Sequence, residues 1–376
     1  MADLSRLVAL SRRFGSDEEW VLAGGGNTSF KDGGTLYVKA SGTSLGTIEA
    51  SGFCSIDMAR LDVLWRATYP EDAGERESAA LADLMAARSK GETKRPSVET
   101  LMHGLFPQTY VVHTHPAAIN GLTCGKEGRA AFDRLFGEEG IWVPFVDPGY
   151  VLAKTVRRAL EEYRTRKGRP PSLMFMENHG LLVADDSPEG VEALSGRIMA
   201  RVRAETKRVP DLSSRPADAL RLASAVKALS RLLGAEATIR FRLDAETLAR
   251  SASRAAFSPL SSAFSPDHIV YAGHEFLFVE GREGSDDSTL IESAWADFVA
   301  RNGAGPRIVV VQGLGAFSCG TTAAAADTAM QLYTDACKIA AYAENFGGAS
   351  HMAKEKIDFI RNWEVERYRS SVAKVS

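Results

Sequence analysis

The chain has 376 residues, 45% of them apolar and 25% charged, which is enough for two globular domains. A formal net charge of −3 gives no electrostatic reason to expect binding to nucleic acid or to an anionic membrane. No segment has the roughly 20 apolar residues of a membrane span, and the amino terminus does not resemble a signal peptide. The four scattered cysteines form no C-x-x-C pair, so we expect free thiols and a cytoplasmic protein.

The first part of the chain begins with a short amphipathic helix and continues with two polar loops around a predicted strand at 36–39. The loop before the strand is Gly24-Gly25-Gly26-Asn27-Thr28-Ser29, and the loop after it is Ala40-Ser41-Gly42-Thr43-Ser44. Such loops offer backbone N–H groups and hydroxyls, which are the donors that bind a phosphate. Each loop alone could equally be an ordinary turn. The phosphate interpretation depends on their occurrence together with Ser97 and with the histidines described below.

Three helices are expected next. Ser55 is a plausible N-cap for a helix through Trp65 and Tyr69, and residues 75–90 form a second helix that is closed by a glycine. Ser97 is the predicted N-cap of the third helix, which runs to residue 106. Glu99 lies in the first turn of that helix. Its carboxylate could simply complement the helix dipole, or it could ligate a metal or transfer a proton beside one.

Histidines at the ends of two apolar strands are the most informative feature. The run at 109–112 leads into His113-Thr114-His115-Pro116, and alternate side chains of a strand share a face. A second run at 172–176 leads into Glu177-Asn178-His179-Gly180. A His-x-His pair can be structural, but three of only seven histidines end apolar strands in this way. This pattern favours a facial three-histidine metal site with open positions for a substrate.

Helices are predicted at 154–167 and 191–208, and the proline-containing segment 209–216 is the best candidate for a linker. We therefore expect a catalytic domain at 1–208, a linker at 209–218 and a second α/β domain at 219–376, with strands at 237–243, 276–280 and 307–312.

A segment of the second domain resembles a segment of the first. Residues 306–317 match residues 171–182 position by position, and in this register Leu314 corresponds to His179. Either the second domain is a degenerate copy that has lost a metal ligand, or two strand–turn–helix units match by chance. Gly313-Leu314-Gly315 could indicate a dinucleotide-binding loop, but Ser318 occupies the place of the third glycine. No acidic residue ends a second strand about 20 positions on, so we reject a dehydrogenase that uses this loop.

Together these motifs resemble the class II aldolase and adducin family over about residues 5–205. The resemblance implies an α/β fold, namely a three-layer α/β/α sandwich around a mainly antiparallel sheet. The motifs that carry it follow the family's order along the chain: Gly26-Asn27-Thr28-Ser29, Ser41-Gly42, Ser97-Val98-Glu99, His113-Thr114-His115-Pro116 and Asn178-His179-Gly180.

By this resemblance, His113, His115 and His179 would hold zinc or another divalent transition metal. Glu99 would be a fourth ligand that moves away to act as the acid/base group. The chain departs from the family's sugar-phosphate aldolases at Val98, where they often have a serine, and the interval from Glu99 to the histidine pair is also shorter than in the fuculose-phosphate aldolase branch. The residues that match phosphate-binding positions are Asn27, Thr28, Ser41, Gly42 and Ser97.

The second half looks like the middle segment of bifunctional rhamnulose-phosphate aldolase and short-chain dehydrogenase proteins. Three segments carry this likeness: Phe264-Ser265-Pro266-Asp267-His268, Gly313-Leu314-Gly315-Ala316-Phe317 and Asn362-Trp363-Glu364. In those proteins a nucleotide-binding dehydrogenase domain follows. This chain ends at Ser376, so we expect no hydride transfer.

The resemblance implies an aldehyde-lyase that cleaves a ketose or ketose 1-phosphate into dihydroxyacetone, or its phosphate, and an aldehyde. A second acid/base group must act at the aldehyde oxygen, and the sequence does not identify it. A pentulose-phosphate epimerase or a dehydratase on the same zinc site remains an alternative, and so does a non-catalytic, adducin-like binding module. We expect a sugar or sugar phosphate as the substrate and, as in many members of the family, a homo-oligomer.

Overall fold

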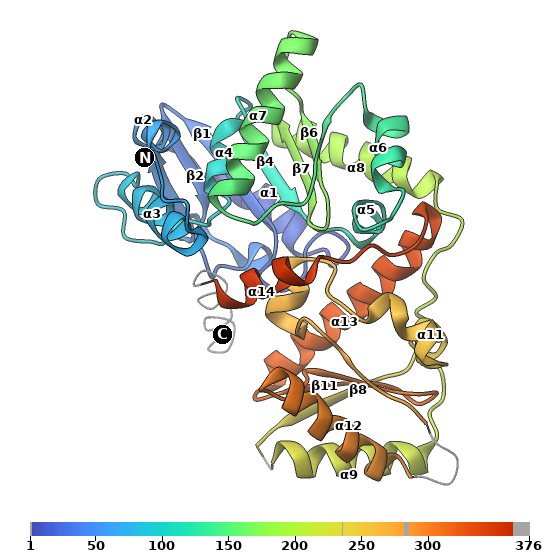
Figure 1. Cartoon of the computed structure of the whole chain (residues 1–376). Coiled ribbons are helices and arrows are strands. Elements are labelled where there is room, and N and C mark those ends of the chain that lie inside the picture. The colour runs from blue at the N-terminus through green and yellow to red at the C-terminus, as the bar shows by residue number, and fades with distance from the viewer. Residues whose placement is uncertain (1, 235, 282–285, 364–376) are drawn as a thin grey trace. The chain divides into compact units, whose positions relative to one another are not determined.

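The computed structural model describes residues 2–234, 236–281 and 286–363 (Figure 1). Two compact units are present: unit 1 comprises residues 2–123 and 127–205 with Trp363, and unit 2 comprises residues 124–126 and 206–362. Residues 209–217 contain no helix or strand apart from an isolated bridge between Ser214 and Asp244. Glu364, the last residue of the third carboxy-terminal motif, lies outside the described residues.

Unit 1 is built on a seven-stranded sheet with the order β3-β2-β1-β4-β7-β6-β5. Its neighbouring strands are antiparallel except for β5 and β6, which are parallel. The expected α/β class with a mainly antiparallel central sheet is therefore confirmed. The strands are β1 (Asn27–Asp32), β2 (Thr35–Lys39), β3 (Phe53–Asp57), β4 (Tyr110–Thr114), β5 (Ile141–Val143), β6 (Leu173–Met176) and β7 (Gly180–Asp185).

Helices cover both faces of this sheet, which gives the expected three layers (Figure 1). One face carries α2 (Met58–Leu61), α3 (Ala73–Ala86), α4 (Thr100–Leu105) and α7 (Tyr150–Lys167). The other face carries α1 (Ser5–Gly15), α5 (Ala117–Thr123), α6 (Gly128–Phe136) and α8 (Pro188–Ala204). Three short 3-10 turns complete the unit: η1 (Leu45–Thr47), η2 (Ala50–Gly52) and η3 (Asp62–Arg66).

The strand alternation of β4 decides which side chains reach the site. Val111 belongs to the core beneath α4 and α7, and His113, two residues further on, shares its face. Asn27 and Ser29 of β1 lie directly opposite His113 and Val111, so they also face the α4 layer. The site is therefore built on the α4 side of the central strands.

Three expected elements differ from the structure. Residues 53–57 form β3 and not the start of a helix, because they pair with β2; the N-cap is Asp57, whose carboxylate accepts from the N–H groups of Ala59 and Arg60. The segment 27–29, expected in a turn, lies in β1. Helix α4 also begins later than predicted, at Thr100.

Unit 2 contains a four-stranded sheet with the order β8-β11-β10-β9. Its strands are β8 (Thr238–Arg242), β9 (Leu277–Val279), β10 (Ile308–Val311) and β11 (Gly315–Gly320). Its helices are α9 (Ala219–Leu233), α10 (Ala245–Ser251), α11 (Arg254–Phe257), α12 (Asp287–Asn302), α13 (Ala323–Ala343) and α14 (Lys354–Asn362). Shorter turns are η4 (Ser258–Leu260), η5 (His268–Ala272) and η6 (Glu344–Phe346). Helices α9 and α12 pack on one face of the sheet, and α13 packs on the other.

This sheet repeats the β4-β7-β6-β5 half of unit 1, strand for strand. In the β6–β7 hairpin Leu173 pairs with Val183, and in the β10–β11 hairpin Ile308 pairs with Ser318, at the same spacing along the chain. The parallel neighbours β5 and β9 and the antiparallel neighbours β4 and β8 also correspond. The resemblance between the two sequence segments is thus accompanied by a repeated strand arrangement, which supports the interpretation of unit 2 as a degenerate copy of half of unit 1.

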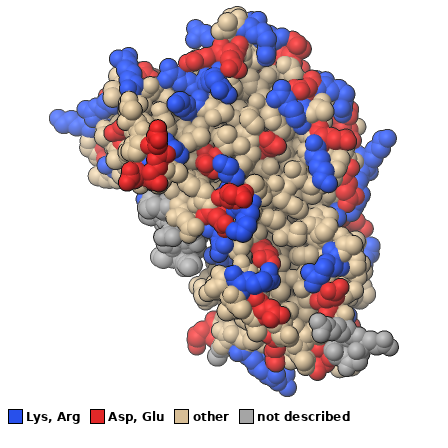
Figure 2. All heavy atoms as spheres, viewed as in Figure 1, with Lys and Arg blue, Asp and Glu red and all other residues tan. Residues whose placement is uncertain are grey.

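On the face drawn in Figure 2, Lys and Arg side chains are interspersed with Asp and Glu over both units, as the small net charge suggests. Among the described residues, no helix has both the length and the apolar character needed to cross a membrane.

Candidate metal centre

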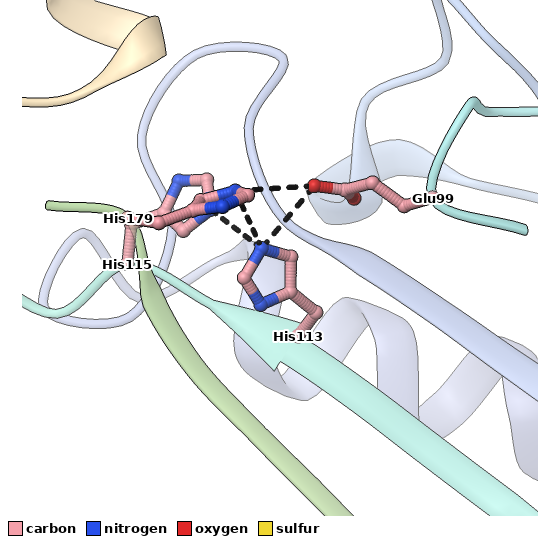
Figure 3. A group of neighbouring side chains, drawn as sticks. All are labelled: Glu99, His113, His115 and His179. Atoms are coloured by element: carbon pink, nitrogen blue, oxygen red, sulfur yellow. Dashed lines mark hydrogen bonds and ion pairs between the residues drawn. The ribbon is translucent and has the colours of Figure 1, made fainter. Parts of the chain in front are cut away.

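Four side chains of unit 1 converge at one point, and these are the residues that the sequence indicated as metal ligands: Glu99, His113, His115 and His179 (Figure 3). One ligand atom from each lies within 4.8 Å of all the others. The Nε2 atom of His113 is 2.9 Å from that of His115 and 3.2 Å from that of His179. A carboxylate oxygen of Glu99 is 3.3 Å from His113 Nε2 and 3.3 Å from His179 Nε2.

The orientation of His113 is fixed by the backbone of the neighbouring strand. Its imidazole is fully buried on β4, and its Nδ1 lies 2.9 Å from the carbonyl oxygen of Leu181 on β7. A carbonyl can only accept, so Nδ1 carries the proton and Nε2 presents its lone pair to the cluster. An outer hydrogen bond of this kind is typical of metal-ligating histidines.

His115 and His179 are placed by a loop and by a tight turn. The N–H of His115 donates to the carbonyl of Trp20 at 3.2 Å, which ties the segment after β4 to the chain before β1. His179 lies in the β6–β7 turn, where Asn178 adopts a positive φ of 50°. The residue after His179 must be a glycine, because a Cβ at Gly180 would lie 2.5 Å from the carbonyl oxygen of Thr114 and 2.6 Å from His115 Cδ2. This role of Gly180 was not predicted, although a glycine that begins an apolar strand is a signal for such a close approach.

Glu99 lies just before α4 and faces the histidines with a side chain that is 19% exposed. Its second carboxylate oxygen accepts from Asn27 Nδ2 at 3.3 Å. Burial works against the charged form, but His113 and His179 outweigh it and hold the pKa of Glu99 well below its usual range. Burial also lowers the pKa of His179 to about 4, so the imidazole is neutral at neutral pH, which is the form that binds a metal.

These residues fit a divalent metal ion. The lone pair on His113 Nε2 faces the Nε2 atoms of His115 and His179 at 2.9 and 3.2 Å, and such close nitrogens repel unless a proton or a cation lies between them. Ligands of a tetrahedral zinc ion, with bonds of about 2.1 Å, would be about 3.4 Å apart, close to the spacings in this cluster. Three imidazoles with a carboxylate are a common donor set for zinc and related transition metals.

Asn27 and Thr28, two of the candidate phosphate-binding residues, point to opposite faces of β1. Asn27 contacts Glu99, and its buried Oδ1 has no hydrogen-bond partner among the described residues. The Thr28 hydroxyl lies 2.7 Å from that of Ser11 on α1, away from the metal cluster. The alternation of a strand explains this separation, which was hidden while the segment was interpreted as a turn.

Ser41, Gly42 and Ser97 lie on two loops that run side by side. An antiparallel bridge joins Ala40 to Pro96, and the N–H of Ser41 donates to the carbonyl of Arg95 at 2.9 Å. Gly42 is exposed with a φ of 84°, and the Ser97 hydroxyl accepts from the N–H of Glu99 at 3.3 Å. The structure therefore brings Ser97 next to Glu99, and a phosphate role for these loops stays a prediction.

Lys39 supports the glycine-rich loop, a role that was not predicted from the sequence. Its side chain is 5% exposed, and its ammonium group donates to the carbonyl oxygens of Gly24 and Gly26, both at 2.8 Å. The loop is thus held by a buried cation that neutralises carbonyl dipoles. The available signal was a lysine at the end of an otherwise apolar strand, just before the Ser41 loop.

Comparison with known proteins supports the likeness seen in the motifs. Residues 5–194 match the family model described as the class II aldolase and adducin N-terminal domain. The chain is 24% identical to a Bacillus subtilis (strain 168) protein named uncharacterized oxidoreductase YuxG, over 98% of this chain and 58% of that protein. The chain therefore spans 58% of the length of this curated relative.

Two solved structures are also similar. The N-terminal class II aldolase domain of a protein from Thermoplasma acidophilum is 29% identical, with a TM-score of 0.46, over 54% of this chain and 93% of that one. L-fuculose-1-phosphate aldolase from Thermus thermophilus is 15% identical, with a TM-score of 0.35, over 54% of this chain and 92% of that one.

Proposed function

Because the chain belongs to the class II aldolase and adducin family, we propose that unit 1 is a zinc-dependent aldehyde-lyase. Its reaction would be the retro-aldol cleavage of a ketose or ketose 1-phosphate into dihydroxyacetone, or its phosphate, and an aldehyde. The observation that carries this proposal is the convergence of three histidine nitrogens and one carboxylate beside a residue with an unpaired buried oxygen, Asn27.

In this proposal His113, His115 and His179 hold the ion. When bound, the cation would supply electrostatic stabilisation of the negative charge that develops on the substrate oxygens as the carbon–carbon bond breaks. The buried imidazole of His113 keeps the correct tautomer through its bond to Leu181, so no proton competes at the ligating nitrogen.

Glu99 would carry the proton. As the carbon–carbon bond breaks, its electron pair is left on the carbon of the dihydroxyacetone fragment. Glu99 would take up a proton from solvent once it has left the histidines that hold it ionised, and would give this proton to that carbon. One oxygen of Glu99 faces the histidines and the other is held by Asn27, so the carboxylate can move between these partners without entering an apolar environment. The carbon on the other side of the broken bond becomes the aldehyde carbon, and a second base must take the proton from its hydroxyl group.

The loops of Ser41 and Ser97 would bind the outer end of the substrate. They are linked by the Ala40–Pro96 bridge, and Ser97 contacts the backbone of Glu99. A phosphate bound there would be close to the acid/base residue, as a ketose 1-phosphate requires. Asn27 Oδ1 would accept from a substrate hydroxyl.

The test combines metal analysis with a product assay. Purified protein should contain about one zinc per chain and should release an aldehyde from at least one member of a panel of ketoses and ketose 1-phosphates. Glu99→Gln should keep the metal and lose activity, whereas His179→Ala should lose both. The matched control is His274→Asn, which removes a half-buried histidine of unit 2 and should change neither.

Other results would overturn the proposal in distinguishable ways. Sugar isomerisation without aldehyde release, dependent on the same histidines, would identify an epimerase, and loss of water would identify a dehydratase. A wild-type protein that takes up no metal when zinc is added would favour a binding module.

A further inference from the structure

Unit 2 contains a cavity of about 370 Å³ at the end of its sheet opposite the β10–β11 turn. The start of β10, the end of β11 and the first turns of α13 line it. In unit 1 the metal centre lies at the turn end of the corresponding hairpin, so this cavity is not the remnant of a metal site. Its volume lies in the range of pockets that bind small organic molecules.

A partly buried arginine without a carboxylate partner lines the cavity. Arg307 donates to the carbonyl oxygen of Val270, and among the described residues no carboxylate oxygen lies within 4.0 Å of its guanidinium. Burial lowers the pKa of Arg307, and no opposite charge offsets that cost. An anion placed beside the guanidinium would supply the missing charge.

The amino terminus of α13 adds positive potential at the same place. This helix has 21 residues and no acidic residue in its first turn, and its Thr322 side chain caps the N–H of Ala325. Ala325 and Thr328 line the cavity together with Thr321, which precedes the cap. A helix of this length carries a partial positive charge at its start, which favours a bound anion.

The corresponding positions of unit 1 have the opposite character. Where unit 2 has Arg307, unit 1 has Ser172, and where unit 2 has Gly320 and Thr321, unit 1 has Asp185 and Asp186. The repeat therefore carries one additional cation and two fewer carboxylates at this end of the hairpin in unit 2. In unit 2 these positions line a cavity and carry a net positive charge, from Arg307, whereas in unit 1 they carry a net negative charge, from Asp185 and Asp186.

The remaining walls are apolar and chemically inert. Trp295 and Tyr271 supply aromatic surface, and Trp295 occupies the place of Leu160 in unit 1. Burial raises the pKa of the Cys319 thiol to about 12, so the sulfur stays protonated and is a poor nucleophile. These walls suit the non-covalent binding of a small molecule that has an apolar face.

We propose that this cavity binds a small organic anion. One phosphate or carboxylate group would contact Arg307 and the start of α13, and the apolar face of the molecule would pack against Trp295 and Tyr271. The site is separate from the metal centre of unit 1 and does not depend on the lyase reaction.

The test uses isothermal titration calorimetry on the full chain in the presence of a chelator, so that the histidine cluster holds no metal. The probes are phenyl phosphate, benzoate and the neutral benzyl alcohol. At least one anion should bind at about one site per chain, benzyl alcohol should bind at least about tenfold more weakly, and the preferred anion distinguishes a phosphate site from a carboxylate site.

Two variants locate the binding. Arg307→Gln should weaken anion binding by at least about tenfold, because it removes the cation. Thr321→Asp should weaken binding to the same extent, because it places a negative charge beside the cavity, where unit 1 has Asp186. Thr321 is exposed, so this replacement leaves the core intact. Arg231→Gln, which removes an exposed arginine of α9 that does not line the cavity, should leave affinity unchanged, and so should His179→Ala. No binding of either anion, equal binding of benzyl alcohol, retention of binding in folded Thr321→Asp, or loss in His179→Ala would overturn the proposal.

Discussion

The two β-hairpins that correspond to each other in the internal repeat have the same backbone and opposite chemistry. In unit 1 the β6–β7 turn presents His179 to His113 and His115, while in unit 2 the β10–β11 turn presents Leu314 to a strand that carries Phe241 and Leu243 at the same register. Both turns use a residue with positive φ, Asn178 at 50° and Gly313 at 65°. The fold therefore needs the turn and the strand pairing, but not the imidazoles.

The glycine that follows each turn supports the same conclusion. A Cβ at Gly180 would lie 2.5 Å from the carbonyl oxygen of Thr114, and a Cβ at Gly315 would lie 2.7 Å from that of Arg242, which is the equivalent atom of the repeat. The close approach is thus a requirement of the hairpin against its neighbouring strand. Gly180 permits the histidines to meet, but a glycine at this place does not by itself indicate a metal.

Exchanging the turn residue of unit 1 for that of unit 2 should have the largest effect. We expect His179→Leu to lower metal content from about one ion to below about a tenth of an ion per chain, and to lower the proposed lyase activity by on the order of 10³-fold. Leucine fits the same turn in unit 2, so the circular dichroism spectrum should not change. Full metal content in a folded His179→Leu protein would show that the comparison misidentifies the ligand.

The reverse exchange, Leu314→His, should destabilise unit 2. Leu314 is 1% exposed and packs in the core beneath α9 and α12, where an imidazole would have no ligand partner on Phe241 or Leu243. We expect a loss of about 2–4 kcal/mol in chemical denaturation and no additional bound metal. Leu314→Met is the control and should cost less than about 1.5 kcal/mol. Uptake of a second metal ion by Leu314→His would contradict this account.

The sequence was sufficient for the family, because its motifs are short and local, and the family resemblance in turn implied the layers of unit 1. It was insufficient where distant segments meet. The contact of Asn27 with Glu99 joins β1 to the start of α4, and the segment of Ser55 became a strand because β2 pairs with it, although its local residues also suit a helix start. Residues 27–29 were expected in a turn for a related reason, since glycines before a strand can be taken for part of a longer turn.

The positive φ in the two turns gives a smaller and more specific test. Asparagine occupies this conformation in unit 1, and open space surrounds Gly313 except for the end of Arg221, so Gly313→Asn should change the free energy of unfolding by less than about 0.5 kcal/mol. Gly313→Val should cost about 1–2 kcal/mol, because a β-branched side chain resists a positive φ. Equal stability of these two variants, measured by urea denaturation, would show that the turn relaxes and that its conformation is not fixed by the repeat.

Substitutions of the N-cap residues after the two hairpins should have the smallest effects on stability. The two losses should be nearly equal if the two caps contribute the same free energy. Ser187 accepts from the N–H of Gly190 at 3.0 Å before α8, and Thr322 accepts from that of Ala325 at 3.1 Å before α13. Ser187→Ala and Thr322→Ala should each reduce stability by about 1 kcal/mol, since each leaves one N–H without its acceptor. The Ser187 hydroxyl also bonds to Asp185, whereas unit 2 has Gly320 at that place, so any excess cost in unit 1 measures this extra bond.

Thr321→Asp provides the matched test, because a carboxylate near the start of α13 should raise the stability of unit 2 by about 0.3–1 kcal/mol while it weakens anion binding. A variant that is more stable but binds less anion would separate the two roles of this helix terminus.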